Sequence, residues 1–581
     1  MNTYELVNTG ADLERISREL ATHPHIGVDT ETTALDPYRG QIRLLQLATP
    51  TKVYILDLFN LPGDALTPIK DVLQADRPVK VLHNAKFDAK MLLHHFGIEL
   101  GRLFDTMLAS QLIAAGDTSQ KHSLVEVVRR YLGQTVDKTQ RTSDWSRLEL
   151  TPAQLAYAAE DVSVLLALRR VMVEKLKQLR LVEAARLEFE AVVPTAAMEL
   201  AGMPLDREAW QALVKDLESR RTVLEDRLQE LLAELLPATD LFGRAEINFN
   251  SPPQVLELLQ RLGLPVTGTT EAELLPFKNH PIVATLLEYR SVQKLLSTYG
   301  RSLLDHLHPV TGRLHGDFHQ IGTPTGRYSC SDPNLQQVPN LPEVRRAFAA
   351  PPGRMLIVAD YSQIELRILA DFSQDQRLLE AFLNNIDLHR LTASLMFKVP
   401  LDAVTKEQRA IAKTINYGLA YGMGAAGLAA RIETSVAEAE RLMATYFDIY
   451  RKVAEWLRAA GDTAVAVGHS RSQSGRLWNF RFDPFDREQV ATIQRLGKNA
   501  PIQGTSADIL KRAMRLVHDG LKPYDARIVN SIHDEIVVEV AASQAEEAAA
   551  VVRQQMVAAG QEFIKTVPVE VDVTISPAWL K

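Results

Sequence analysis

The sequence is poor in cysteine, with Cys330 as the only one among 581 residues. A single thiol excludes a disulfide framework and fits a reducing compartment. No stretch of 18 apolar residues occurs, so no segment is a candidate transmembrane helix. The first residues lack a basic segment followed by an apolar run, so we expect no signal peptide. These absences predict a cytoplasmic protein without a membrane partner.

A surplus of basic residues is also missing. The formal net charge is −7, from 65 Lys and Arg against 72 Asp and Glu. This balance neither indicates nor excludes nucleic-acid binding, because a basic groove needs only local clustering. The contents of apolar residues, 46%, and charged residues, 24%, are ordinary for a globular protein. The length exceeds a single core and predicts roughly three to five domains.

Residues 354–367, RMLIVADYSQIELR, combine an apolar run, an acid and then helical spacing. The run Met355–Ala359 predicts a buried strand that ends near Asp360, and the apolar residues from Ile364 onward predict a helix. Taken alone, an Asp before a helix is usually an N-cap. The choice between a cap and a catalytic acid depends on whether a second acid lies nearby.

Residues 527–540, RIVNSIHDEIVVEV, supply such an acid. Two β-rich runs flank His533, Asp534 and Glu535, which predicts a hairpin with these residues at its tip. Alone, the tip would be an ordinary solvated turn. Together with Asp360, however, Asp534 could hold two Mg²⁺ ions, because hard carboxylate oxygens suit Mg²⁺. Two such ions about 4 Å apart stabilise an in-line phosphoryl displacement.

Residues 1–190 predict an α/β unit. Four carboxylates stand at or near the ends of its elements. Each alone would be a solvated surface acid, but clustered acids repel unless a cation lies between them. Tyr157 and Asp161 are four residues apart and share one helix face. The expected elements are strands at 25–30, 42–47, 53–58 and 79–83 and a helix at 152–171, and the acids are Asp29, Glu31, Asp88 and Asp161.

The segments DTETTALD, NAKFD and YAAED resemble the three motifs of DEDDy-type 3′-5′ proofreading exonucleases, which have an RNase H-like fold. The resemblance implies that the four acids bind two metal ions while Tyr157 orients the attacking water. It also implies that Asn84 and Leu35 contact the 3′-terminal nucleotide. The segment FDTML at 104–108 fits the same family, with Asp105 in a structural role.

Residues 213–236 form a long amphipathic run, which predicts a coiled-coil-like hairpin. Ser251 is placed to cap the next helix. This order resembles the thumb of family A DNA polymerases. The resemblance implies that Lys294, Ser297 and Thr298 contact duplex phosphates, a contact that carries no sequence information.

Residues 315–339 are polar and turn-rich, and a long loop of this kind is usually functional or disordered. They resemble the family A palm segment that follows the minor groove of the primer–template, which implies that Arg327, Asn334 and Gln336 bind DNA. Minor-groove acceptors are shared by all base pairs, which suits an enzyme that must accept all four. The alternative for Arg327 is an ordinary surface ion pair.

A capping box at Thr405–Gln408 predicts the start of a helix with the sequence RAIAKTINYGLAYG. At about 100° per residue, Arg409, Lys413, Tyr417 and Tyr421 form one stripe. Two cations and two rings suit a nucleoside triphosphate. An ordinary amphipathic helix is the alternative.

The pattern R-x₃-K-x₃-Y-G-x₂-Y-G resembles the O-helix in the fingers of family A DNA polymerases. The resemblance implies that Arg409 and Lys413 bind the triphosphate, that Lys413 protonates pyrophosphate, and that Tyr417 stacks on the incoming nucleotide. A Tyr at position 417 implies weak discrimination against dideoxynucleotides.

The resemblance extends from about residue 20 to the end and matches the large fragment of bacterial family members, an arrangement that phage and plasmid enzymes share. It implies an α/β and α+β multidomain protein. The expected parts are an exonuclease domain (1–190), thumb (191–310), palm (311–374), fingers (375–490) and palm again (491–581). A 5′-nuclease domain is not expected, and neither is nick translation.

The implied reaction is attack of a primer 3′-OH on the α-phosphate of a dNTP. Asp360 and Asp534 would hold two Mg²⁺ ions, for which Mn²⁺ can substitute, with help from the Tyr361 carbonyl, and Glu535 would support the site less directly. Glu365 resembles the gate that excludes ribonucleotides, close to Tyr421. The other implied residues are Gln363 and His389 for the nucleotide and Arg495, Asn499, Gln503 and His533 for DNA. The implied partners are primer–template DNA and dNTPs, bound by a nucleoid-associated monomer.

Three alternatives stay open. A single-subunit RNA polymerase shares palm and fingers motifs, but not the exonuclease set or Glu365. A free-standing exonuclease needs only residues 1–190. A non-catalytic clamp needs no convergent carboxylates.

Overall fold

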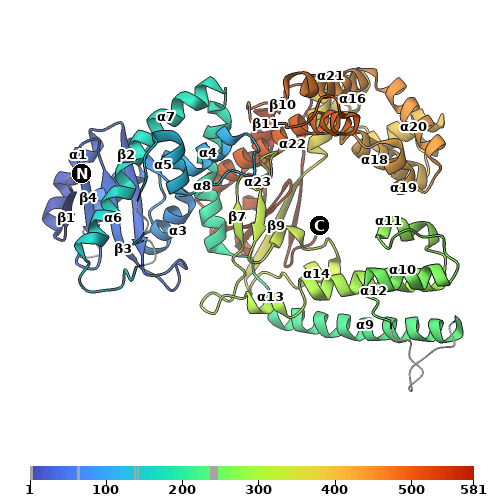
Figure 1. Ribbon diagram of the computed structural model, residues 1–581, viewed down its shortest axis with the longest axis horizontal. Coiled ribbons are helices and arrows are strands. Elements are labelled where there is room, and N and C mark those ends of the chain that lie inside the picture. Colours follow the sequence, from blue (N-terminus) through green and yellow to red (C-terminus); the bar gives the residue numbers. More distant parts are fainter. Residues whose placement is uncertain (1–3, 62–65, 137–138, 141–142, 236–246) are drawn as a thin grey trace.

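Two large sheets organise the protein. The computed structural model describes residues 4–61, 66–136, 139–140, 143–235 and 247–581. The six-stranded sheet has the order β1-β4-β3-β2-β5-β6, and the four-stranded sheet has the order β12-β13-β9-β14. Figure 1 shows the first sheet at one end of the long axis and the second at the centre. Among the described residues, no helix is both long enough and apolar enough to cross a membrane.

The six-stranded sheet confirms the four predicted strands to within two residues at each end. Strand β3 runs antiparallel to its neighbours β2 and β4, and the other pairs are parallel. The strands are β1 (Tyr4–Val7), β2 (His25–Thr32), β3 (Ile42–Ala48), β4 (Val53–Asp57), β5 (Val79–Leu82) and β6 (Leu103–Asp105).

Helices cover both faces of this sheet and form two separate hydrophobic cores. The helical stretch predicted over 152–171 is confirmed, but it is interrupted at Val164, where two helices meet. The first core contains side chains of α1 (Leu13–Ala21), α2 (Thr67–Gln74) and α3 (Ala85–Phe96), and the second contains those of α4 (Thr106–Ala114), α5 (Leu124–Leu132), α6 (Pro152–Ser163) and α7 (Leu165–Gln178). Helix α8 (Val182–Ala201) contributes side chains to both of these cores and also to the core of the central sheet.

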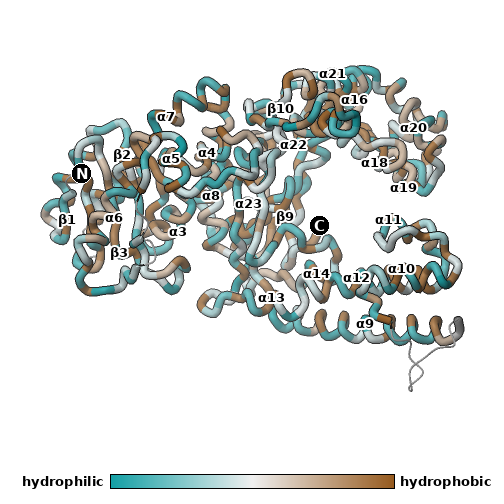
Figure 2. The backbone as a smooth tube through the Cα atoms, viewed as in Figure 1, coloured by the Kyte–Doolittle hydropathy of each residue, from teal (hydrophilic) through white to brown (hydrophobic). Residues whose placement is uncertain are grey.

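A helical arm follows. Helix α9 (Arg207–Leu235) is one continuous helix that packs against α12, so the run does not form a hairpin by itself, and Leu236 lies outside the described residues. Teal and brown segments alternate along α9 in Figure 2, as expected of a helix with one apolar face. Ser251 occupies the N-cap of the next helix, but its side chain makes no capping hydrogen bond, contrary to expectation. The remaining helices are α10 (Pro252–Arg261), α11 (Glu271–Leu274), α12 (Pro281–Thr298) and α13 (Ser302–Asp305).

The central sheet is antiparallel, with β9 between β13 and β14. The stretch 315–339 is not entirely loop, because β7 and β8 pair within it. The elements are β7 (Asp317–His319), β8 (Ser329–Ser331), α14 (Pro342–Arg345), β9 (Arg354–Tyr361), α15 (Ile364–Ser373), α22 (Arg487–Gly520), β12 (Ala526–Ile532), β13 (Glu535–Ala541), α23 (Ala545–Gln561) and β14 (Val571–Ser576).

A second helical unit is inserted between α15 and α22. Its α18 begins with the predicted capping box, in which Thr405 and Gln408 bond each other's backbone. Figure 1 shows α18, α19 and α20 on the opposite side of the view from α10, α11 and α12. The elements are α16 (Gln376–Leu383), α17 (Leu388–Phe397), α18 (Lys406–Ala420), α19 (Ala425–Ile432), α20 (Val436–Ile449), α21 (Arg451–Val467), β10 (His469–Arg471) and β11 (Leu477–Asn479).

The structure decides two questions left open by the central motifs. Asp360 lies inside β9, and the N-cap of α15 is Gln363 in a left-handed conformation, so the cap interpretation of Asp360 is wrong. The predicted hairpin of β12 and β13 is confirmed, with His533 and Asp534 at its turn. Glu535 is not at the tip, because it is buried and already paired in β13.

Candidate active sites

The first site lies where β9 ends. Asp360 is the last residue but one of this strand, and its direct partners across the sheet are Glu535 on β13 and Asp572 on β14. Directly opposed residues project from the same face of a sheet. The amide of Tyr361 donates to the carbonyl of Asp534 at 3.3 Å, which ties the hairpin turn to the end of β9. The sheet therefore brings the two predicted acids together.

A cavity of about 450 Å³ opens beside these acids. Burial, followed by the charges of Asp360 and Glu365, raises the pKa of Asp534 to about 7. Carboxylates that repel in this way favour a divalent cation between them, and their oxygens are the ligands that Mg²⁺ prefers. The donor set therefore fits a divalent metal. The cavity is lined by Arg327, Asp360, Tyr361, Ser362, Gln363, Ile364, Glu365, Tyr417, Tyr421, Ser506, His533, Asp534 and Asp572.

A lysine touches the same acids. The Lys581 ammonium lies 2.8 Å from Asp360 Oδ2 and 2.7 Å from Glu535 Oε2. Glu535 also accepts from Trp579 Nε1 at 2.7 Å, so its carboxylate is held by protein groups. The sequence reasoning missed both Lys581 and Asp572. The alternation in VEVDVTIS signals that Asp572 lies on one strand face, whereas no local pattern points to Lys581.

Helix α18 presents its polar stripe beside the cavity. Arg409 and Lys413 are exposed, and Tyr417 and Tyr421 line the cavity with their ring centroids 6.5 Å apart and their planes 21° apart. Tyr421 lies one residue beyond the end of the helix. Arg409 Nε bonds Asp387 Oδ2 at 2.8 Å. The stripe therefore has its cations in the first half of α18 and its aromatic rings at the end.

His389 packs behind this stripe as a neutral residue. Its ring centroid is 5.6 Å from that of Tyr417, and burial lowers the pKa of His389 to about 4. The side-chain amide of Asn416 lies 3.0 Å from His389 Nδ1 and can donate to it. In that tautomer the ring carries its proton on Nε2, which makes His389 an uncharged donor at neutral pH.

Glu365 and Arg327 form an ion pair across the cavity. Glu365 is buried on α15, and its burial raises its pKa, while Arg327 lowers it. Arg327 comes from the loop between β7 and β8, so two segments predicted to act on different parts of the substrate meet here.

The other predicted nucleic-acid contacts lie outside the cavity lining, except His533. Gln336 Nε2 donates to the carbonyl of Ser531 at 3.0 Å, and Asn334 caps the short 3-10 turn that follows it. Arg495, Asn499 and Gln503 recur every four residues on α22 and share one face. Lys294, Ser297 and Thr298 are exposed at the end of α12.

The second site lies on the six-stranded sheet. Asp29 and Glu31 on β2 and Asp161 on α6 bring carboxylate oxygens within 4.8 Å of one another. Tyr157 is one turn before Asp161, and its ring centroid is 6.2 Å from that of Trp145. Burial, followed by Asp161 and Glu31, raises the pKa of Tyr157, so its hydroxyl keeps its proton. The three converging acids fit a divalent cation.

Asp88 is not part of this group of three. It lies in the first turn of α3 and accepts from Thr30 Oγ1 at 2.7 Å, and its burial raises its pKa to about 7. Asn84 precedes α3 in a left-handed conformation, and Leu35 is 81% exposed. All four acids of the motif are present, but the fourth, Asp88, lies outside the group of three whose oxygens converge.

Asp105 has the structural role predicted for it. Its carboxylate accepts from the amides of Met107 and Leu108 at the start of α4, and from those of Asn84 and Ala85 at the start of α3. One buried side chain thus caps two helices, of which α3 carries Asp88.

Comparison with known proteins gives concordant results. The sequence profile of DNA polymerase family A matches residues 214–581, and that of a 3′-5′ exonuclease matches residues 4–177. DNA polymerase I of Aquifex aeolicus is 33% identical over 608 residues, with full coverage of both chains. DNA polymerase I of Pseudomonas aeruginosa is 33% identical over 614 residues, which cover 99% of this chain and 66% of the relative.

The structure also resembles a solved one. The POL domain of Pol1 from M. smegmatis, in complex with DNA primer–template and dNTP, superposes with a TM-score of 0.84 and 28% identity, and 99% of each chain is covered.

Proposed function

The chain belongs to DNA polymerase family A, carries a 3′-5′ exonuclease domain and is a DNA polymerase, and on this premise we propose which of its residues carry the two reactions. Asp360 and Asp534 would hold the divalent cations of the polymerase site, with the Tyr361 carbonyl as a further ligand. The metal is Mg²⁺, with Mn²⁺ as a substitute. When bound, the cations neutralise charge on the attacking and leaving oxygens of a phosphoryl transfer. Glu535, held by Trp579 and Lys581, supports the site indirectly.

The incoming dNTP lies along α18. Arg409 and Lys413 contact its phosphates, and Lys413 gives a proton to the departing pyrophosphate. Tyr417 stacks on the nucleotide, and His389 adds a neutral donor. Glu365 lies beside Tyr421 and sterically excludes a ribose 2′-OH. Gln363, in the same cavity lining, also contacts the nucleotide. The shared cavity lining of Glu365, Tyr417 and Tyr421 supports this arrangement.

Primer–template DNA is the macromolecular partner, bound by a monomer. Arg327 and Gln503 read minor-groove acceptors at the primer end, where every correct pair presents the same kind of acceptor. Phosphates meet Lys294 and Thr298. The other DNA contacts are Asn334, Gln336, Arg495, Asn499 and His533.

Proofreading uses the second site. Asp29, Glu31 and Asp161 would hold its cations together with Asp88, which would reach them from α3, and Tyr157 would orient the attacking water. Asn84 and Leu35 contact the 3′-terminal nucleotide, and the exposure of Leu35 supports this role.

The domain limits we propose are 1–190 (exonuclease), 191–310 (thumb), 311–374 and 491–581 (palm) and 375–490 (fingers). The protein works in the cytoplasm, on the nucleoid.

The convergence of Asp360 and Asp534 on a cavity lined by Glu365 and the two tyrosines carries this proposal. Primer extension with dNTPs or NTPs tests it directly. Asp534→Ala should abolish synthesis and spare 3′-5′ degradation, whereas Asp29→Ala with Glu31→Ala should do the reverse. Glu174→Ala, at an exposed acid of α7, is the control and should change neither. If both activities fell together in each variant, the assignment of two independent sites would be wrong.

A further inference from the structure

Arg327 stands at the end of a tight turn between β7 and β8. The Gly326 amide donates to the Thr323 carbonyl at 2.9 Å, and the Arg327 amide donates to Thr323 Oγ1 at 3.1 Å. Gly326 has a φ of +85°, which favours glycine, and a Cβ there would lie 2.5 Å from Arg476 Nε. The turn is therefore shaped both by its own hydrogen bonds and by the side chain packed behind it.

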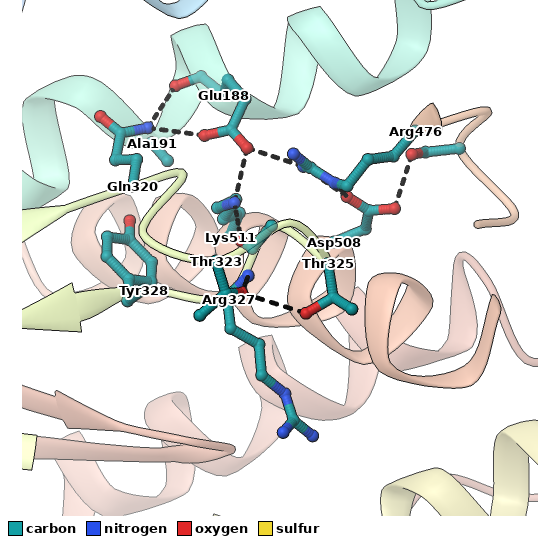
Figure 3. A network of polar contacts seen from close by, with 12 residues as sticks. Glu188, Ala191, Gln320, Thr323, Thr325, Arg327, Tyr328, Arg476, Asp508 and Lys511 are labelled. Atoms are coloured by element: carbon teal, nitrogen blue, oxygen red, sulfur yellow. Dashed lines mark hydrogen bonds and ion pairs between the residues drawn. The ribbon is translucent and has the colours of Figure 1, made fainter. Parts of the chain in front are cut away.

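Four charged side chains form a buried ion cluster behind this turn (Figure 3). Arg476 Nη2 lies 2.7 Å from Asp508 Oδ1 and 2.7 Å from Glu188 Oε1, and Lys511 Nζ lies 2.5 Å from Glu188 Oε1. Each of the four is at most 4% exposed. The cluster joins α8, the residue before β11, and α22, and its two cations and two anions balance.

The cluster donates a hydrogen bond to a carbonyl of the turn. Lys511 Nζ also donates to the carbonyl oxygen of Gly326, the residue before Arg327. On either side of the turn, Gln320 Nε2 donates to the Glu188 carbonyl at 2.8 Å, and the Tyr328 hydroxyl lies 2.8 Å from Thr195 Oγ1 on α8. The Arg327 side chain extends from the turn away from the cluster in Figure 3 and pairs with Glu365.

Burial of four charges is an expensive way to stabilise a fold, because apolar residues of the same volume often do so equally well. A hydrogen-bonded charge, in contrast, fixes the direction of the group it binds. We propose that Lys511, held by Glu188, is a positioning residue for Arg327, fixing the Gly326 carbonyl so that the Arg327 guanidinium reaches the primer end. This inference rests on the proposed role of Arg327.

A double-mutant cycle of Lys511→Met and Arg327→Ala tests the inference. The measured quantity is the single-turnover rate of correct dNTP addition at saturating DNA, with KM for the dNTP determined separately. We expect Arg327→Ala to slow addition roughly 10-fold to 100-fold and Lys511→Met about 10-fold, in the range for a hydrogen bond to a charged group. If Lys511 acts through Arg327, the double variant should be no slower than Arg327→Ala. If the two losses multiply, the inference is wrong.

A modified primer separates this inference from the role of Arg327 itself. The primer ends in 3-deazaguanine, which lacks the minor-groove N3 acceptor. If Arg327 reads that acceptor, Arg327→Ala should reduce the rate of dNTP addition only slightly on this primer. The rate reduction caused by Lys511→Met should then also be smaller than on the natural primer. An Arg327→Ala defect equal on both primers contradicts the proposed role of Arg327, while the cycle on the natural primer still decides whether Lys511 acts through it.

Two further variants control for a purely structural effect. Thr195→Val removes the bond to Tyr328 but leaves the ion cluster intact, so it should keep the normal rate ratio between the two primers. Glu188→Gln keeps the side-chain volume and replaces Lys511→Met in the cycle if that variant is unfolded by circular dichroism. Exonuclease activity on single-stranded DNA should stay unchanged in every folded variant. If it falls in parallel with polymerisation, the cluster only stabilises the fold, and the inference is wrong.

Discussion

Replacing Asp105 by alanine removes the acceptor shared by two helix starts. The carboxylate accepts four backbone amides at 2.7–3.2 Å, two at α3 and two at α4. An N-cap contributes about 1–2 kcal/mol, so two caps contribute about 2–4 kcal/mol. Burial raises the pKa of Asp105 to about 6 and offsets part of this gain. We therefore expect Asp105→Ala to lower the free energy of unfolding of the exonuclease domain by about 2 kcal/mol at pH 7.

Urea unfolding followed by fluorescence and by loss of exonuclease activity measures this change. Asp105→Asn keeps one acceptor oxygen, so its free energy of unfolding should fall by about half as much as that of Asp105→Ala. DNA synthesis should survive in both variants, because the polymerase domain has its own core. If Asp105→Ala kept the wild-type unfolding midpoint but lost exonuclease activity in the folded state, Asp105 would belong to the chemistry and the structural interpretation would be wrong.

Three further predictions concern the polymerase site. Glu365→Ala should raise ribonucleotide incorporation at least 10-fold in a dNTP/NTP competition, and unchanged selectivity would refute its role as a gate. Burial raises the pKa of Tyr417 to about 12, so its hydroxyl stays a donor that can replace the missing 3′-OH of a dideoxynucleotide. Tyr417→Phe should then discriminate against ddNTPs about 10-fold more strongly, and equal discrimination would contradict this. Burial lowers the pKa of His389 to about 4, so between pH 6.5 and 4 the unfolded chain binds a proton that the folded chain does not, and stability falls as the pH falls. Between pH 7 and pH 5, the free energy of unfolding of His389→Gln, measured by urea titration, should fall by about 2 kcal/mol less than that of the wild type. Parallel pH profiles would refute a buried neutral ring.

Local patterns predicted the elements that carry the main acids. The apolar run before Asp360 is a buried strand, the acids of HIGVDTET share one strand face, and the capping box at Thr405 opens α18. These succeed because burial, alternation and capping act over a few neighbouring residues. The break at Val164 was not predicted for the same reason, because helical spacing continues through it and the sequence carries no Gly or Pro there.

Features that depend on the register of distant segments could not be predicted. Asp572 meets Asp360 only because β14 pairs with β9, and Glu535 binds Trp579 and Lys581 only because the end of the chain returns to the central sheet. The buried ion cluster joins positions between 188 and 511, which no local window compares. In sequence, each of its members is an ordinary charged residue of an amphipathic helix or turn.

The central position of β9 has a consequence for motion. The strand that carries Asp360 is hydrogen-bonded along both edges, to β13 and to β14, and its residues 356–359 are buried. Amides in such a strand exchange with solvent only in rare global openings, whereas exposed helices open locally at low cost. On helix α18 the side chains of Arg409 and Lys413 are exposed to solvent. Hydrogen exchange should therefore find the β9 amides next to Asp360 among the slowest of the protein and the amides at the start of α18 among faster ones, so that the helix proposed to bind the nucleotide can move while the strand proposed to bind metal stays in register.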